Sequence, residues 1–253
     1  MIDSNKILPY LEFNLTDHCN LNCKGCTHFC PIADENYLTM DTFQRDMKRL
    51  SEIFANISKI RILGGEPLLH PLVAEFAEKT CQIFPDSEVF IVTNGILLPT
   101  MNSSFYETLQ KNKVTLHISI YPITKEKISS YTLLAYQYKI PINFSIADHL
   151  GKMINATGDS DKHYIFKQCW AKSCTFLHYG KIYHCCMPAL SYNINKKFGW
   201  NIPSDSCMDI HTNVSAEEIL DFLSRPSSTC AYCTESTCFP WEVSKCKEDE
   251  WLV

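Results

Sequence analysis

Cys19-Asn-Leu-Asn-Cys23-Lys-Gly-Cys26 is the stretch on which the interpretation of this chain depends. Its three thiols lie within eight residues, so the loop brings three sulfurs together without help from distant chain. A four-iron cluster normally takes four thiolates, and three ligands leave one iron open. Structural zinc, the alternative, prefers paired C-x2-C or C-x4-C arms and a closed set of four ligands. The spacing therefore favours an iron-sulfur cluster with one open iron.

A second motif follows in the expected order. Gly64-Gly65-Glu66-Pro67 comes directly after the apolar run 60–63. Together the two motifs resemble the signature of the radical S-adenosylmethionine (radical SAM) superfamily, whose "GGE" motif follows the second barrel strand. One position departs from that pattern, because Gly25 stands where the family usually has an aromatic residue near the adenine. We expect Phe29 or His28 to take over this contact.

Length and charge limit the classes of function. A chain of 253 residues accommodates one barrel-sized domain with a small appendage. Its net charge of -5 and the lack of a basic run argue against a nucleic-acid partner. The sequence has neither an apolar run long enough to span a bilayer nor a signal-peptide pattern. We therefore expect a cytoplasmic protein with no membrane partner.

The chain is rich in cysteine, with 14 residues. In a reducing compartment such thiols more often bind metal than form disulfides. Four lie in residues 19–30 and nine in residues 169–246. Only Cys81 stands alone, on a helical pattern, where a buried inert thiol is expected.

Hydrophobic periodicity predicts a repeating strand-helix unit. Apolar and polar residues alternate over 10–15, so the cysteine loop follows a first strand. Asp41 and Gln44 suggest a capping box for a helix over 41–54. Further strands are expected at 60–63, 88–93, 114–120 and 142–146, and further helices at 71–84, 105–110 and 125–138. The pattern indicates a parallel α/β fold with its site at the carboxyl ends of the strands. The family resemblance implies a partial, open (β/α)6 TIM-like barrel, with 163–167 as a weak candidate for the sixth strand.

The composition changes beyond the fifth strand. Residues 147–168 are polar without a clear period and indicate a linker or active-site loop. We place a domain boundary here, with the barrel in 1–168 and a small C-terminal iron-sulfur domain, a hairpin plus a helix, in 169–253. The hairpin is expected over 174–185, and the helix begins at a capping box of Ser215 and Glu218.

The C-terminal cysteines resemble the twitch or SPASM accessory domain of radical SAM enzymes, in which Gly180 to Cys185 matches the G-x4-C element. The resemblance implies one auxiliary [4Fe-4S] cluster, and either Cys169 or Cys186 is an alternative to a neighbouring ligand. A closed zinc site is the other interpretation. Cys246 and Cys238 depart from the spacing of a second auxiliary cluster. The expected ligands are Cys174, Cys185, Cys230 and Cys233.

The resemblance also implies a binding site for S-adenosylmethionine on the open iron. Gly64, Gly65, Glu66 and Pro67 would lie at its methionine end, Thr93 and Asn94 near its ribose, and Ser119 at the end of the fourth strand. Tyr121, Asp148 and His149 lie at strand ends where they would meet substrate.

The expected reaction is oxidation of a small molecule. In the family, reductive cleavage of S-adenosylmethionine gives a 5'-deoxyadenosyl radical that takes a hydrogen atom from substrate. A fully ligated auxiliary cluster suits acceptance of an electron, so we expect oxidation of a secondary alcohol of a sugar-like or aminocyclitol substrate. Flavodoxin or ferredoxin would donate the electron for cleavage.

Three alternatives remain open. A peptide (RiPP) maturase often carries a leader-binding wing, for which a first strand near residue 10 leaves no room. A radical epimerase would return a hydrogen atom from a thiol, with Cys30, Cys186 and Cys238 as candidates. The non-enzymatic alternative is a zinc-stabilised binding module.

Overall fold

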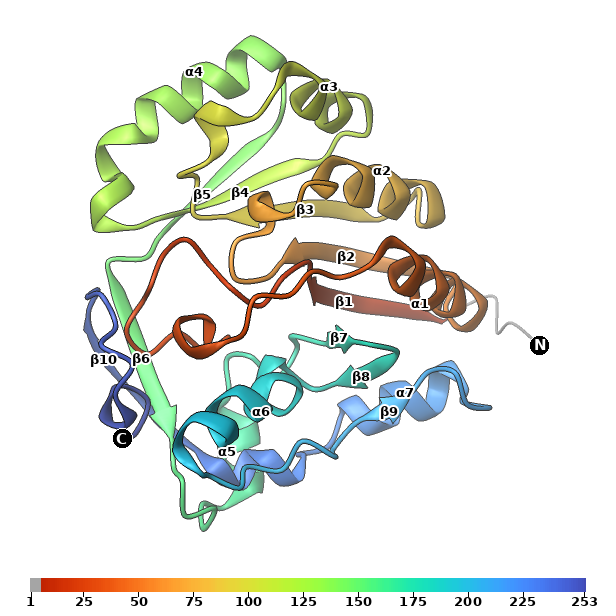
Figure 1. Ribbon diagram of the computed structural model, residues 1–253. Helices are drawn as coiled ribbons and strands as arrows, with labels where there is room; N and C mark the ends of the chain where they lie inside the picture. The colour runs from red at the N-terminus through yellow and green to blue at the C-terminus, as the bar shows by residue number, and fades with distance from the viewer. Residues whose placement is uncertain (1–5) are drawn as a thin grey trace.

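The computed structural model describes residues 6–253 and confirms the parallel α/β architecture. Five strands lie side by side in sequence order and pair in parallel (Figure 1). Each is followed by a helix, except the fifth. The strands are β1 (Ile7–Asn14), β2 (Asn56–Leu63), β3 (Glu88–Thr93), β4 (Thr115–Ile120) and β5 (Ile142–Ile146), and the helices are α1 (Met40–Ile53), α2 (Val73–Ile83), α3 (Ser103–Lys111) and α4 (Ile128–Tyr138).

The sixth parallel strand lies beside β1 and not beyond β5. It is β7 (Phe176–His178), which pairs with β1, and the sheet continues antiparallel through β8 (Lys181–Tyr183) and β9 (Met208–Asp209). The predicted hairpin is thus confirmed as β7 and β8, and it extends the barrel sheet. Among residues 6–253, β5 has no strand partner on its outer side, so the barrel is open.

The weak candidate strand over 163–167 is wrong. These residues form helix α5 (Lys162–Gln168), because the carboxylate of Asp161 accepts hydrogen bonds from the backbone N–H groups of His163 and Tyr164. An aspartate in this position is a strong helix N-cap. The predicted loop over 147–168 therefore contains α5 and also strand β6 (His149–Ile154).

The C-terminal region covers the cysteine loop. Strand β10 (Cys233–Pro240) pairs antiparallel with β6, and Val243 then pairs with Cys23. Figure 1 shows β6, β10 and the C-terminus beside the loop that follows β1. Segments from 1–168 and 169–253 therefore share both sheets, and the boundary between two domains stays a prediction.

The remaining regular elements complete this arrangement. Helices α6 and α7 follow β8 and β9, and α7 begins at the predicted capping box of Ser215 and Glu218. The remaining bounds are α6 (Cys186–Phe198), α7 (Ala216–Leu223) and the short 3-10 helices Cys30–Ile32, Pro67–Leu69, Leu98–Thr100, Pro122–Lys127, Ser228–Tyr232 and Glu248–Glu250.

The two faces of the sheet differ in chemistry, and this positions the site. Phe13, Ile62 and Ile91 point to one face and pack in the core with residues of α1 to α4. The other face carries Glu12 and Arg61, whose positions are direct partners in the β1–β2 register. Since successive strand side chains point to opposite faces, this charged pair lies on the inner wall of the open barrel.

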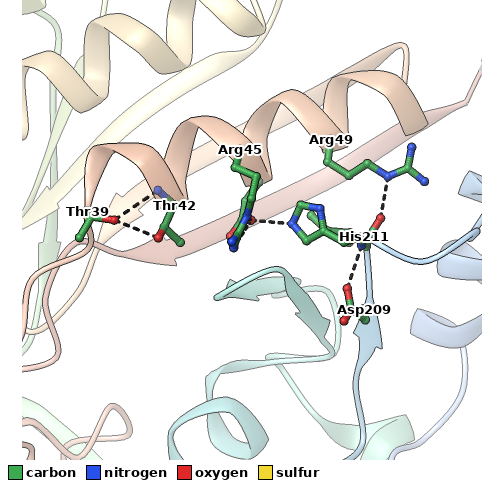
Figure 2. Close-up of polar contacts among 8 residues, drawn as sticks. Thr39, Thr42, Arg45, Arg49, Asp209 and His211 are labelled. Atoms are coloured by element: carbon green, nitrogen blue, oxygen red, sulfur yellow. Dashed lines mark hydrogen bonds and ion pairs between the residues drawn. The ribbon is translucent and has the colours of Figure 1, made fainter.

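Helix α1 is fastened to the segment after β9 by polar contacts (Figure 2). His211 Nε2 lies 2.7 Å from Asp46 Oδ1, and Arg49 Nε donates to the carbonyl of Ile210 at 2.7 Å. The predicted capping box of Asp41 and Gln44 is wrong, because the helix begins at Met40 and the Thr39 hydroxyl is its cap. In the described part of the chain, no helix has both the length and the apolarity that crossing a bilayer requires.

Candidate active site

A cavity of about 520 Å³ lies at the carboxyl ends of the strands, and Cys19, Cys23 and Cys26 all line it. Burial raises the pKa of Cys19 well above its usual range, and the nearby Cys26 and Cys23 sulfurs add to the effect. Burial likewise raises the pKa of Cys23 to about 12. Three thiols that are buried or partly buried and repel each other as thiolates suit a cationic iron centre, which requires deprotonated ligands.

Cys26 is the member of the trio that ionises most easily. A hydrogen bond from the Cys30 thiol and nearby backbone N–H groups, including that of His28, lower the pKa of Cys26 to about 7 although the sulfur is buried. Of the three thiols, this one is therefore the easiest to deprotonate for metal binding.

Donors from two other segments and from the cysteine loop itself point at the two remaining sulfurs. The indole Nε1 of Trp241 donates to Cys23 Sγ at 3.2 Å, and Tyr121 also hydrogen-bonds this sulfur. The backbone N–H of Leu21 donates to Cys19 Sγ at 3.3 Å. Hydrogen bonds to cluster sulfurs are one of the main ways in which a protein sets a reduction potential.

The second motif packs directly against the cysteine loop. The backbone N–H of Gly65 donates to the carbonyl of Thr16 at 2.8 Å, and that of Glu66 to the carbonyl of His18 at 3.1 Å. A Cβ on Gly65 would lie 1.8 Å from the His18 oxygen, so only glycine fits. The two glycines therefore allow the ends of β1 and β2 to meet.

Glu66 joins this motif to the end of β3. Its carboxylate, which is fully buried, accepts hydrogen bonds from Thr93 Oγ1 at 2.7 Å and from the Asn94 N–H at 2.8 Å. Burial raises the pKa of Glu66 to about 7. Gly64, Gly65, Thr93 and Asn94 line the cavity, whereas Glu66 and Pro67 lie behind it. The structure thus brings the predicted cofactor residues together, with Glu66 as their support.

The glycine before the third cysteine has a structural cause. Gly25 has φ +67°, and a Cβ there would lie 2.7 Å from the ring of Phe239 in β10. Of the two expected replacements for the missing aromatic residue, Phe29 is fully buried with Trp251, whereas His28 lines the cavity. His28 is therefore the better placed of the two.

Other predicted site residues also reach the cavity. Ser119, Tyr121 and His149 line it, and Asp148 instead pairs with the His149 ring at 3.0 Å. The three candidate thiol donors, Cys30, Cys186 and Cys238, line the same cavity.

A second cavity, of about 200 Å³, gathers four thiols: Cys169, Cys185, Cys230 and Cys233. Burial raises the pKa of Cys233 to about 12, and the Cys230 and Cys169 sulfurs contribute. Cys185 and Trp170 line both cavities, so the two groups of thiols lie on either side of a thin wall.

Cys174 does not line this second cavity, although Cys169 is near enough to help raise the pKa of its thiol. Cys174 lines the larger cavity, where its thiol faces Glu12, Arg61 and Tyr10. Of the expected auxiliary ligands, Cys185, Cys230 and Cys233 come together, and Cys169 occupies the place assigned to Cys174.

Several lining residues have no motif that reveals them. Arg61 and Trp170 lie in the larger cavity, and Trp241 contacts Cys23 from the far end of the chain. Glu12 was the one available signal, because it is the charged residue of the alternating stretch 10–15, whose polar side chains share one face of the strand.

Comparison with known proteins supports the motif assignment. Residues 13–132 match the Radical SAM superfamily model. GTP 3',8-cyclase of Microcystis aeruginosa is 31% identical over 126 residues, which cover 48% of this chain and 38% of that protein. Molybdenum cofactor biosynthesis protein 1 of Dictyostelium discoideum is 36% identical over 135 residues, 51% of this chain and 20% of its own length. The matched region thus spans well under half of these relatives.

One solved structure resembles almost the whole chain. The structure of BtrN in complex with AdoMet and 2-DOIA covers 97% of this chain and 98% of its own, with a TM-score of 0.59 and 18% identity. At this identity the likeness concerns the fold, and it includes the C-terminal region with the second group of thiols.

Proposed function

Because residues 13–132 place this chain in the radical SAM superfamily, we propose that Cys19, Cys23 and Cys26 hold a [4Fe-4S] cluster whose open iron binds S-adenosylmethionine. When bound, these groups supply a 5'-deoxyadenosyl radical that removes a hydrogen atom from substrate. The chain binds and orients the cofactor and shields the cavity from water.

One observation carries this proposal: the cysteine loop, the glycine pair and the end of β3 enclose a single cavity. Asn94 connects them, since its backbone N–H donates to Glu66 and its side chain donates to Asn20 Oδ1 at 2.7 Å. The carboxylate of Glu66 therefore fixes the wall of the cofactor site. Its two oxygens accept bonds from protein donors, so its role is to position the Gly64-Gly65 turn and the residues after β3.

We further propose that Cys169, Cys185, Cys230 and Cys233 hold one auxiliary [4Fe-4S] cluster. A complete set of four thiolates leaves no iron for substrate, so this site suits acceptance of an electron. Its place behind Cys185 and Trp170, both of which also line the larger cavity, supports transfer from a substrate radical. The net reaction would then be an oxidation.

For the substrate we propose a sugar-like or aminocyclitol molecule with a secondary alcohol. The presence of Glu12 and Arg61 in a cavity of about 520 Å³ favours a small compound that carries polar groups over a wholly apolar one. The whole-chain likeness to BtrN, whose structure contains 2-DOIA, agrees in fold. Flavodoxin or ferredoxin is the proposed electron donor.

Thiol-dependent epimerisation is the second candidate, since Cys30, Cys186 and Cys238 all line the larger cavity. A thiol there would return a hydrogen atom to the substrate radical without net oxidation. Incubation in deuterated water separates the two candidates: incorporation of deuterium into recovered substrate, without an oxidised product, favours epimerisation.

Two cysteine variants test the proposal. Cys23→Ala should abolish 5'-deoxyadenosine formation, whereas Cys233→Ala should retain uncoupled cleavage of S-adenosylmethionine and lose product formation. Cys81→Ala is the matched control, because this thiol lies on α2 with the Asn112 carbonyl as its partner. Unchanged cleavage by Cys23→Ala, or a colourless anaerobic preparation that contains zinc without labile sulfide, would overturn the assignment in favour of a zinc-stabilised module.

A further inference from the structure

The larger cavity contains one pair of fully charged side chains, Glu12 on β1 and Arg61 on β2. Their Cα positions are direct partners in the parallel register, so both side chains project from the same face. Glu12 is 5% exposed, and Arg61 is partly buried. Burial raises the pKa of Glu12, although the hydrogen bond from Tyr10 and the charge of Arg61 oppose this effect. A carboxyl and a guanidinium at such depth require a reason, because burial without full pairing costs free energy.

The pair is joined through a tyrosine and not directly. The Tyr10 hydroxyl donates to Glu12 Oε2 at 2.6 Å, and Arg61 Nη1 donates to the Tyr10 oxygen at 3.2 Å. Within residues 6–253, the side chains of Glu12 and Arg61 make no further hydrogen bond. Neither of them takes part in an ion pair within 4.0 Å. Of the five N–H donors of the guanidinium, most therefore face the cavity without a protein partner, as does Glu12 Oε1.

The two groups have opposite requirements. The guanidinium needs acceptor oxygens, whereas the carboxylate needs a donor such as an ammonium or hydroxyl group. Their formal charges cancel, and neither Lys nor Asp is among the residues that line this cavity. A ligand with a single negative group would satisfy Arg61 and be repelled by Glu12. A ligand with adjacent amine and hydroxyl groups satisfies both.

We propose that Glu12 and Arg61 form the recognition site for two neighbouring substituents of an amino polyol, with the amine on Glu12 and a hydroxyl oxygen on Arg61. This inference rests on the proposed function, because it assigns the substrate class to the same cavity. Cys174, which faces the same pair, then lies at the substrate end of the cavity.

Binding without turnover tests the inference. The anaerobic holoprotein, without reductant, is titrated with glucosamine, inositol and glucuronate as probes, and affinity is measured by calorimetry and by the shift in Tm. Glucosamine should bind most tightly. Glu12→Gln and Arg61→Met should each weaken its binding about tenfold or more, the size expected when a hydrogen bond to a charged group is lost.

Matched variants keep the result independent of folding. Glu52→Gln and Arg45→Met change the same residue types on the outer surface of α1 and should leave glucosamine binding unchanged. Arg61→Lys keeps the charge and the strand while it removes the guanidinium fork, and it should also weaken binding. If Arg61→Met unfolds, Arg61→Lys still reports on the contact.

Three outcomes would overturn the inference: no glucosamine binding to the wild type, equal binding to wild type and the Glu12→Gln and Arg61→Lys variants, or preference for glucuronate that Glu12→Gln strengthens. The proposed function has a separate assay, formation of 5'-deoxyadenosine on reduction. Loss of cleavage with retained glucosamine binding refutes the proposed function alone, and retained cleavage with no binding refutes the recognition site alone.

Discussion

Replacement of Cys169 or Cys174 by alanine discriminates between the two possible sets of auxiliary ligands. Cys169 lines the cavity of about 200 Å³ with Cys185, Cys230 and Cys233, whereas Cys174 lines the larger cavity beside Glu12. Only the first substitution removes a thiol from the group of four. We therefore expect opposite results from two cysteines that are five residues apart in sequence.

The size of the effect follows from the two groups of thiols. One [4Fe-4S] cluster on each group gives about eight irons per chain. Cys169→Ala leaves three thiolates at the second group, as at the first, so it should open one iron of the auxiliary cluster, change the electron paramagnetic resonance signal of that cluster and lower the iron content below about eight. Cys19, Cys23 and Cys26 remain in place, so uncoupled cleavage of S-adenosylmethionine should persist.

The assay is iron and sulfide determination on protein that is reconstituted and desalted anaerobically, with electron paramagnetic resonance of the reduced samples. Cys174→Ala is the matched control and should keep about eight irons and both signals. If Cys174→Ala lost iron while Cys169→Ala kept all eight and both signals, the assignment from the structure would be refuted and the spacing from Cys174 would be correct.

Three other predictions concern the cofactor site. Gly65→Ala places a Cβ 1.8 Å from the His18 carbonyl oxygen. Because neither backbone segment can move aside easily, we expect a loss of about 3 kcal/mol or more in the free energy of unfolding, measured by urea denaturation. Gly199→Ala, whose Cβ would have no atom within 4 Å, should lose less, and equal losses would contradict this reason. Burial lowers the pKa of His28 to about 4, below the unfolded value of about 6.5. The unfolded chain therefore binds the extra proton as the pH falls, and the free energy of unfolding should decrease by about 1.4 kcal/mol between pH 7.5 and 5.5. His28→Phe should remove this part of the pH dependence of stability, and an unchanged pH dependence would contradict the prediction. Trp241→Phe removes the N–H that donates to Cys23. Because a reduced cluster gains more from such a hydrogen bond than an oxidised one, the midpoint potential should fall by tens of mV, and by at most about 130 mV, which is the free energy of one hydrogen bond to a charged group. Redox titration followed by electron paramagnetic resonance measures the potential, and a rise in potential would contradict the prediction.

Local patterns anticipated much of the barrel. The hydrophobic pattern located five strands, all of which the structure confirms within a few residues, and the structure adds that the glycine pair allows the close contact between β1 and β2. Errors occurred where a single polar side chain decided the outcome. Asp161 starts a helix where a sixth strand was expected, and Thr39 caps α1 in place of Asp41.

The sequence by itself determined the cysteine trio, since three thiols within eight residues stay close whatever the rest of the chain does. It also placed this loop at a strand end, because the alternation stops there. Only the tertiary structure decided which distant groups meet: Cys169 in place of Cys174 at the second cavity, Trp241 against Cys23, and Glu12 beside Arg61. The reason is physical, because contacts between residues far apart in sequence depend on strand register and on how the C-terminal strands pack, and no local period encodes either.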